Sequence, residues 1–280
     1  MTHSLRDRFR DLHAAGTFIL PNPWDVGSAR ILERLGFAAL ATTSSGHAAS
    51  LGRLDQQVTR DELVAHVAAI CAAVSVPVNV DAERCFADDA AGIARTVDLL
   101  AAAGAAGISI EDYDPGRGAV DPVEVAVDRV AAAARACARH GILLTARAEN
   151  HLYGHPDLDD TIARLQAFHQ AGAEAVYAPG LTSIEDIRRV VTRLPAPVNV
   201  LALAAGPPVP VLAEAGVRRV STGGGLAWAA YGALLAAGRE LLEHGSTGYL
   251  AGALPAAQAK AAFSPGSEQS GTIAEIRGPA

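Results

Sequence analysis

Short apolar runs alternate along the chain with longer stretches whose apolar residues recur at helical spacing. The short runs are continuous, which is typical of strands that are buried on both faces of a parallel sheet. We expect strands at residues 17–21, 37–42, 78–81, 107–110, 142–146, 175–178, 198–201 and 217–221. We expect helices at residues 5–15, 25–35, 59–74, 88–103, 121–140, 157–171, 183–194, 210–215 and 226–244.

Local signals support these boundaries. Thr59 and Glu62 have the spacing of a capping box, and Gly36 and Gly141 follow two of the helices. The segment TTSSGHAASLGRLD, residues 42–55, is polar and contains glycine, and it is expected to be a loop.

Regular strand–helix alternation over 280 residues favours an α/β fold, a (β/α)8 barrel of the TIM type. A doubly wound sheet is the alternative, but no GxGxxG follows the first strand. We expect one barrel domain with C-terminal helices over residues 1–263. Residues 264–280 are rich in Gly, Ser and Pro and are expected to be disordered.

The composition narrows the function classes. A net charge of −7 argues against a nucleic-acid or anionic membrane surface. Three widely spaced cysteines, without a CxxC pair, fit a reducing compartment. The N-terminal stretch is charged and has no apolar signal core, and no apolar run is long enough to span a bilayer. We therefore expect a cytoplasmic protein that acts on a small molecule.

The run PVNVDAERCF, from Pro77, carries two acids at the end of a predicted strand. Asp81 and Glu83 are two positions apart, so both side chains lie on one side of an extended chain. Their mutual repulsion calls for a divalent cation or shared protons between them. The alternative is two solvated acids at a strand exit.

Further polar residues follow the other predicted strands, and the C-terminal ends of barrel strands are where such enzymes build their sites. They include Glu111 and Asp112, Arg147 and Glu149, and Asn199, with Asp55 within reach from the loop after the second strand. Oxygen ligands without His or Cys favour Mg²⁺ or Mn²⁺ over zinc.

Arg147 lies where a bidentate clamp for a carboxylate or phosphonate is needed. The alternative is that Arg147 only neutralises Glu83 and Glu111. Cys85 is a nucleophile or a packed thiol, and the sequence pairs no His with it. The glycines of STGGGLAW, from Ser221, are expected to form a turn rather than a phosphate site.

Taken together, these motifs resemble the isocitrate lyase and phosphoenolpyruvate mutase superfamily. The resemblance runs from about residue 5 to about residue 242, and its motifs occur in chain order. They are NPWDVGSAR from Asn22, ATTSSG from Ala41, SLGRLD from Ser50, PVNVDAE from Pro77, GISIED from Gly107, TARAEN from Thr145, VYAPG from Val176 and PVNVL from Pro197.

The resemblance implies a homotetramer or dimer of dimers, often with an exchanged eighth helix, and Mg²⁺ bound mostly through water. It assigns the metal to Asp81, Glu83 and Glu111, and catalysis to Asp55, Arg147 and Glu149. It implies contacts to a 2-oxo acid from a further set of residues, which comprises Trp24, Thr43, Ser45, Gly46, His47, Arg147 and Asn199.

One segment departs from the superfamily pattern. Its lyases carry a Lys–Cys–Gly loop after the fourth strand, whereas DYDPGRGAVDP follows Glu111 here and has neither Lys nor Cys. The resemblance then implies a lyase that cleaves a C–C bond of a 2-oxo acid through an enolate, as in oxaloacetate decarboxylation. The alternatives are P–C chemistry on phosphonopyruvate and a non-catalytic metabolite-binding barrel.

Overall fold

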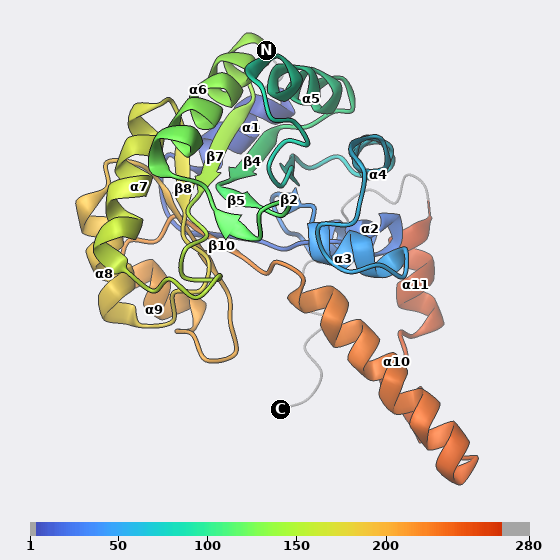
Figure 1. Cartoon of the computed structure of the whole chain (residues 1–280). Helices are drawn as coiled ribbons and strands as arrows, with labels where there is room; N and C mark the ends of the chain where they lie inside the picture. The colour runs from blue at the N-terminus through green and yellow to red at the C-terminus, as the bar shows by residue number, and fades with distance from the viewer. Residues whose placement is uncertain (1–3, 265–280) are drawn as a thin grey trace.

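Eight parallel strands curve into a nearly closed barrel in the computed structural model, which describes residues 4–264 (Figure 1). Their order around the described part of the sheet is β1-β10-β9-β8-β7-β4-β3-β2. Their bounds are β1 Phe18–Leu20, β2 Leu40–Ala41, β3 Val78–Asp81, β4 Gly107–Glu111, β7 Leu143–Arg147, β8 Ala175–Tyr177, β9 Val198–Leu201 and β10 Arg219–Ser221.

Single hydrogen bonds rather than a ladder bring β1 to β2. The Ala41 N–H donates to the Pro21 carbonyl at 3.0 Å, and the side-chain Nδ2 of Asn22 donates to the Thr42 carbonyl at 2.7 Å. Asn22 Oδ1 in turn accepts from the Thr222 and Gly223 N–H groups beyond β10. Asn22 thus ties three strand ends together, and the expected barrel is confirmed.

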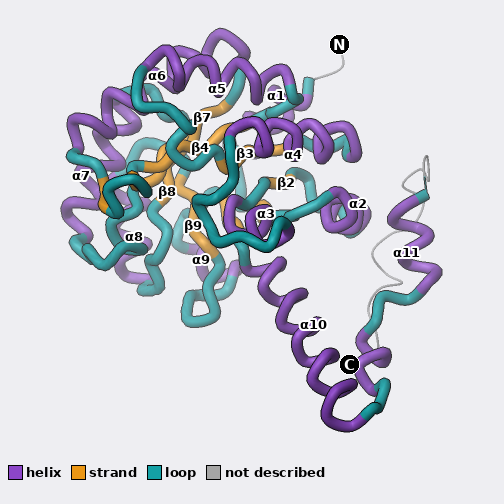
Figure 2. Tube along the Cα trace, turned by 45° about the vertical axis from the view of Figure 1, so that its right-hand side comes forward, coloured by secondary structure: helices purple, strands orange, loops and turns teal. Residues whose placement is uncertain are grey.

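Helices surround the barrel, and the loops cross its two ends (Figure 2). The helices are α1 Leu5–Leu12, α2 Val26–Arg34, α3 Ser44–Ser50, α4 Arg60–Ala73, α5 Ala90–Ala102, α6 Val123–His140, α7 Leu158–Gln170, α8 Ile184–Arg193, α9 Val209–Glu214, α10 Gly225–His244 and α11 Ala256–Phe263, with a 3-10 turn at Gly248–Gly252. The capping box at Thr59 is present, because its hydroxyl accepts from the Glu62 N–H and the Glu62 carboxylate accepts from the Thr59 N–H.

The core has two parts, one on each side of the strands. Outward-facing residues such as Val80, Ile108 and Leu144 are buried against the helices. At the N-terminal end of the barrel, Phe9 of α1 packs among inward-facing small and aliphatic residues. A Cβ at Gly107 would lie 2.4 Å from the Phe9 ring, so this strand position needs glycine.

A short helix and a hairpin were not predicted from the sequence. Residues 44–50, expected to be loop, form α3, because Thr43 caps it and Ala48 is buried beneath it. The segment after β4 forms a small antiparallel hairpin, β5 Tyr113–Asp114 with β6 Ala119–Val120. Apart from Ser264, the predicted disordered tail lies outside the described residues.

The last long helix points away from the barrel. Figure 1 shows α10 extending outward and α11 returning beside α2. Trp228, Leu234, Leu235 and Leu242 of α10 are each more than half exposed.

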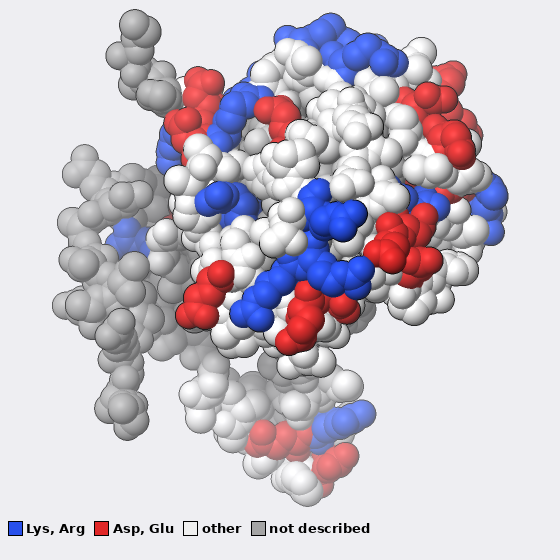
Figure 3. Space-filling model, turned by 90° about the vertical axis from the view of Figure 1, so that its left-hand side faces the viewer, with Lys and Arg blue, Asp and Glu red and all other residues white. Residues whose placement is uncertain are grey.

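Acidic and basic side chains are mixed on the face that carries α7 and α8 (Figure 3). Arg189 and Asp159 form an exposed pair at 2.9 Å, and pairs of this kind contribute about 0–1 kcal/mol. Among the described residues, no helix has the length and apolar character needed to cross a membrane.

Candidate active site

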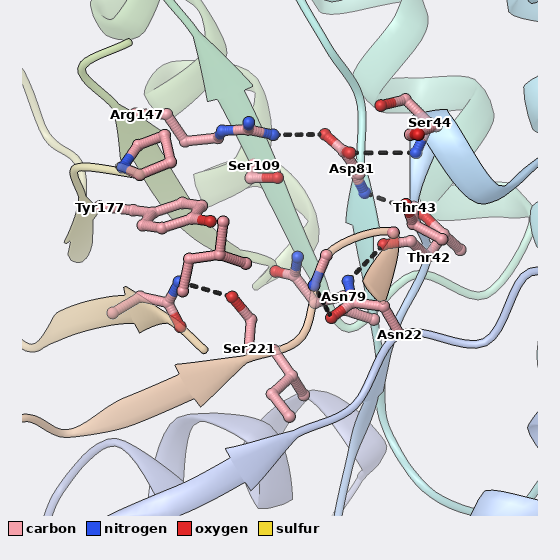
Figure 4. Close-up of a pocket in the computed structure, with 18 of the residues that line it drawn as sticks. Asn22, Thr42, Thr43, Ser44, Asn79, Asp81, Ser109, Arg147, Tyr177 and Ser221 are labelled. Atoms are coloured by element: carbon pink, nitrogen blue, oxygen red, sulfur yellow. Dashed lines mark hydrogen bonds and ion pairs between the residues drawn. The ribbon is translucent and has the colours of Figure 1, made fainter. Parts of the chain in front are cut away.

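A pocket of about 150 Å³ opens at the C-terminal ends of the strands (Figure 4). Its polar lining comes mostly from strand ends and from the first turn of α3. These polar residues are Asn22, Thr42, Thr43, Ser44, Ser45, Asp55, Asn79, Asp81, Ser109, Arg147, Tyr177, Asn199, Arg219 and Ser221. Asn79 Oδ1 is buried and has no hydrogen-bond partner in the described structure.

Asp81 lies at the mouth of this pocket and is held from both sides. Arg147 Nη1 donates to Asp81 Oδ1 at 2.8 Å, and the Ser44 N–H donates to Oδ2 at 3.1 Å. The Ser44 side chain is hydrogen-bonded to Asp55, so Ser44 bridges two carboxylates. Asp55 as a whole residue is exposed, but its carboxyl group is partly removed from water. This burial of the carboxyl group, followed by the negative charge of Asp81, raises the pKa of Asp55.

Arg147 contacts three acids rather than open space. Besides Asp81, its Nε donates to Glu149 at 2.7 Å and its Nη1 lies 3.3 Å from Glu111. Its guanidinium also lies 5.2 Å from the centre of the Tyr177 ring. Burial alone would lower the pKa of Arg147, but the charges of Glu149, Asp81 and Glu111 raise it well above its usual range. The ion-pair alternative is therefore present, with Glu149 and Asp81 in place of Glu83.

Negative charge exceeds positive charge around this arginine. Burial, followed by the charges of Asp81 and Asp55, raises the pKa of Glu83 to about 8. Burial is also the main cause that raises the pKa values of Glu111 and Glu149. Carboxyl groups that share one arginine remain undercompensated, and a bound cation would relieve their repulsion.

The turn after β3 carries backbone strain next to these acids. Glu83, Cys85 and Phe86 have φ angles of 47°, 60° and 53°, in the left-handed region. Non-glycine residues there cost about 1–3 kcal/mol each, and such strain clusters at functional sites. The Glu83 carbonyl accepts from the Glu111 N–H at 3.0 Å, which holds the turn against β4.

Ion pairs anchor both ends of the β5–β6 hairpin. The Asp121 N–H donates to the Asp112 carbonyl at 2.7 Å, and Arg164 Nη1 donates to Asp112 Oδ2 at 3.1 Å. Arg84 pairs with Asp121 at 3.0 Å. The Tyr113 ring stacks on Tyr153, with centroids 3.6 Å apart. The segment after β4 is thus a short, braced hairpin.

With this geometry in view, the comparisons with known proteins identify the family. The model of the phosphoenolpyruvate phosphomutase family matches residues 9–242. The chain belongs to this family. An uncharacterized protein of Mycobacterium tuberculosis (strain H37Rv) is 36% identical over 218 residues, which cover 77% of this chain and 81% of the relative.

A crystal structure of a Burkholderia cenocepacia J2315 protein is 43% identical, with a TM-score of 0.89, and the match covers 93% of this chain and 96% of that chain. The oxaloacetate decarboxylase of Pseudomonas putida (strain GB-1) is 31% identical over 204 residues, 69% of this chain and 68% of the relative. Other relatives bear the names 2-methylisocitrate lyase and 2,3-dimethylmalate lyase. The expected family is confirmed, and several named relatives are lyases.

Within this family member, the structure places the predicted site residues in three groups. Those that line the pocket are Thr43, Ser45, Asp55, Asp81, Arg147 and Asn199. Those that are buried and absent from the pocket lining are Glu83, Glu111 and Glu149, and the structure joins the last two directly to Arg147. Those not brought to the pocket are Trp24, Gly46 and His47.

The third group has structural contacts that explain its position. The Gly46 N–H donates to the Thr43 hydroxyl, and a Cβ at Gly46 would lie 3.0 Å from Trp24 Cβ. Trp24 therefore packs closely against α3 at Gly46. The His47 ring stacks on His66 at 3.7 Å, and burial lowers the pKa of His47. The substrate contacts expected for these three residues find no support in the geometry.

Several residues that line the pocket were not predicted as site residues from the sequence. Asn79, Ser109 and Arg219 each stand two positions before a polar strand end, at Asp81, Glu111 and Ser221. Period-two alternation places them on the inward face, and this signal could have found them. Cys85 is fully buried and burial raises the pKa of its thiol to about 12, in agreement with a packed thiol.

Proposed function

We propose that this protein is a divalent-cation-dependent lyase that cleaves the C–C bond next to the 2-oxo group of a small acid, with oxaloacetate as the first candidate substrate. One feature of the site supports this most directly. Asp81 and Asp55 meet at the mouth of a small polar pocket, with more carboxylates behind them than Arg147 can neutralise. A carbonyl acid and a cation fit such a site together.

The donor set fits Mg²⁺ or Mn²⁺. Asp81, Glu83 and Glu111 are the residues proposed to hold the ion, and all offer hard oxygen ligands. Within residues 4–264, no three acidic, His or Cys side chains are arranged to hold a metal by themselves. The proposed ion is therefore one bound largely through water, a mode that Mg²⁺ favours. When bound, the ion polarises the 2-oxo group and stabilises negative charge that develops there.

Decarboxylation requires only one proton transfer from the protein. When CO₂ leaves a 2-oxo diacid, the bonding electrons delocalise into the oxo group, and the carbon later takes up one proton. Asp55 lines the pocket and its pKa is raised, so it is the proposed proton donor. Cleavage of a hydroxy acid also needs a base for the hydroxyl proton, and the braced hairpin brings no such group from the Lys–Cys–Gly pattern.

The remaining pocket residues are proposed to bind and orient the substrate. The hydroxyl groups of Thr43 and Ser45 lie at the pocket wall, where they can donate to the substrate carboxylate. Arg147 is the proposed clamp for an anionic group, and Glu149 and Glu111 fix its orientation from behind. A substrate carboxylate would replace part of the contact that Asp81 makes with this guanidinium.

We also propose that the chain forms a homo-oligomer through α10. This helix leaves Leu234, Leu235 and Leu242 exposed, and large exposed apolar patches mark interaction sites. Leu235→Glu combined with Leu242→Glu should reduce the assembly to a smaller species in light scattering. A wild type that is monomeric at micromolar concentration would contradict the proposal.

Turnover of a substrate panel tests the proposed function. Oxaloacetate, methylisocitrate and phosphonopyruvate all release pyruvate on cleavage, so one coupled assay follows all three. With Mg²⁺ present, we expect the largest kcat/KM for oxaloacetate. Asp81→Asn should lose activity by at least about 100-fold, whereas the exposed Asp61→Asn should not. Absence of pyruvate from every substrate would favour a non-catalytic binding barrel.

A further inference from the structure

A buried arginine lies deeper in the same pocket than the residues at the strand ends. Arg219 of β10 lines the pocket and is 3% exposed. It occupies the inward face of its strand two residues before Ser221, one layer deeper in the barrel. No acidic side chain among the described residues forms an ion pair with it.

Each side-chain partner of Arg219 is neutral. Its Nε donates to Asn199 Oδ1 at 2.9 Å, and its Nη2 donates to the Thr145 hydroxyl at 3.1 Å. Its Nη1 lies 3.2 Å from His13 Nε2. Burial, together with the positive charge of Arg219, lowers the pKa of His13 to about 3, so this ring is uncharged. Its Nδ1–H donates to the Phe9 carbonyl, which leaves Nε2 as the acceptor.

The guanidinium retains donors for a ligand. An arginine has five N–H groups, and these partners take one from each of the three nitrogens. One N–H on each terminal nitrogen therefore remains, and a carboxylate can accept hydrogen bonds from such N–H groups. Burial lowers the pKa of Arg219 to about 10, which is the sign of an uncompensated buried charge. By contrast, the buried Arg129 lies 3.9 Å from Asp121.

We propose that Arg219 binds a second carboxylate of the substrate at the floor of the pocket, so that the site selects 2-oxo dicarboxylic acids over 2-oxo monocarboxylic acids. Asn199, Thr145 and His13 are positioning residues that hold the guanidinium. This inference rests on the proposed function, because it presumes that the other end of the acid lies at the mouth near Asp81.

A pair of stable ligands tests the inference without turnover. Malate and 2-hydroxybutanoate have the same four-carbon length and differ in whether the far end is a carboxylate or a methyl group. Calorimetric titration of the wild-type protein with each acid, in buffer that contains Mg²⁺, should show that malate binds at least about tenfold more tightly than 2-hydroxybutanoate. In Arg219→Met the preference should disappear, while 2-hydroxybutanoate binding changes by less than about threefold.

A second variant keeps the test decisive if Arg219→Met does not fold. Asn199→Asp is nearly isosteric and gives Arg219 an internal counter-ion at the 2.9 Å contact. It should raise the melting temperature and abolish the malate preference. Equal affinity of the wild type for both acids, or a preference that survives in both variants, would overturn the inference while the mouth site stands. If neither acid binds the wild type, the proposed function falls with it.

Discussion

Replacement of Arg147 by methionine should destabilise the folded protein strongly and in a pH-dependent manner. The side chain is 13% exposed and contacts Glu149, Asp81 and Glu111, which are 1%, 14% and 4% exposed. Removal of one partner from a buried ion pair costs about 3–5 kcal/mol, because the remaining charge stays buried without compensation. We expect a loss of that size in the free energy of unfolding at pH 8 in metal-free buffer.

The sign of the pH effect follows from the acids that remain. Burial already raises the pKa values of Glu111 and Glu149 in the folded protein, and loss of the cation raises them further. The folded variant then holds more protons than the unfolded chain at pH values above the ordinary carboxyl range. Its stability relative to wild type should therefore fall as pH rises, and the loss should be smaller at pH 5 than at pH 8.

Urea unfolding followed by circular dichroism measures both quantities. Arg147→Lys keeps the charge but loses the fork, and should cost about 1.5–3 kcal/mol, the range for a hydrogen bond to a charged group. Arg189→Met is the matched control, since its pair with Asp159 is exposed, and it should cost less than about 1 kcal/mol. An Arg147→Met protein as stable as wild type at pH 8 would refute the reasoning.

Three further outcomes are expected. Asp81→Asn should weaken Mg²⁺ binding in calorimetry by at least about tenfold while the unfolding midpoint changes little, because Arg147 keeps Glu111 and Glu149 as partners and the cluster loses surplus negative charge; unchanged affinity would contradict this. Because the pKa of Glu83 is raised to about 8 in the folded protein, the wild type should lose stability as pH rises from about 4.5 to 8. The loss in the free energy of unfolding over this range should be at most about 5 kcal/mol, and Glu83→Gln should lack most of it. A parallel slope in both proteins would count against it. Native Cys85 should resist alkylation at pH 8 and react only after unfolding, since its thiol is fully buried and its pKa is raised to about 12; rapid labelling of the native protein would be the contrary result.

Much of the fold was predictable because its signals are local. The β3 bounds at Val78–Asp81 and the capping box at Thr59 follow from a short apolar run and from a three-residue spacing. Helix α3 was missed because five of the seven residues in SSGHAAS are weak helix formers and the segment has no apolar period. Tertiary packing stabilises it, through close contacts of Gly46 with Thr43 and Ala227. The β5–β6 hairpin was missed because two-residue strands carry no periodic signal.

The candidate site was predictable only in part, for a related reason. Strand ends mark Asp81 and Arg147, but a sequence does not reveal which acids an arginine contacts once the strands are in register. Arg219 illustrates the difficulty, because Arg218 and Arg219 look alike along the chain. The pairing of β10 with β9 turns Arg219 into the barrel beside Asn199. His47 was expected at the site from its motif, but its ring stacks on His66 and it is not among the residues that line the pocket.

The most direct test of the central claim is the rate of pyruvate formation from oxaloacetate after exhaustive treatment of the protein with a chelator and after return of Mg²⁺. Protein-free Mg²⁺ serves as the reference, because the ion alone accelerates this reaction. The proposed function predicts that the chelated protein forms pyruvate no faster than chelated buffer without protein. Once Mg²⁺ is restored, the rate with protein should be well above the rate with Mg²⁺ alone. Full activity in chelator, or a rate with Mg²⁺ and protein no higher than with Mg²⁺ alone, would contradict it.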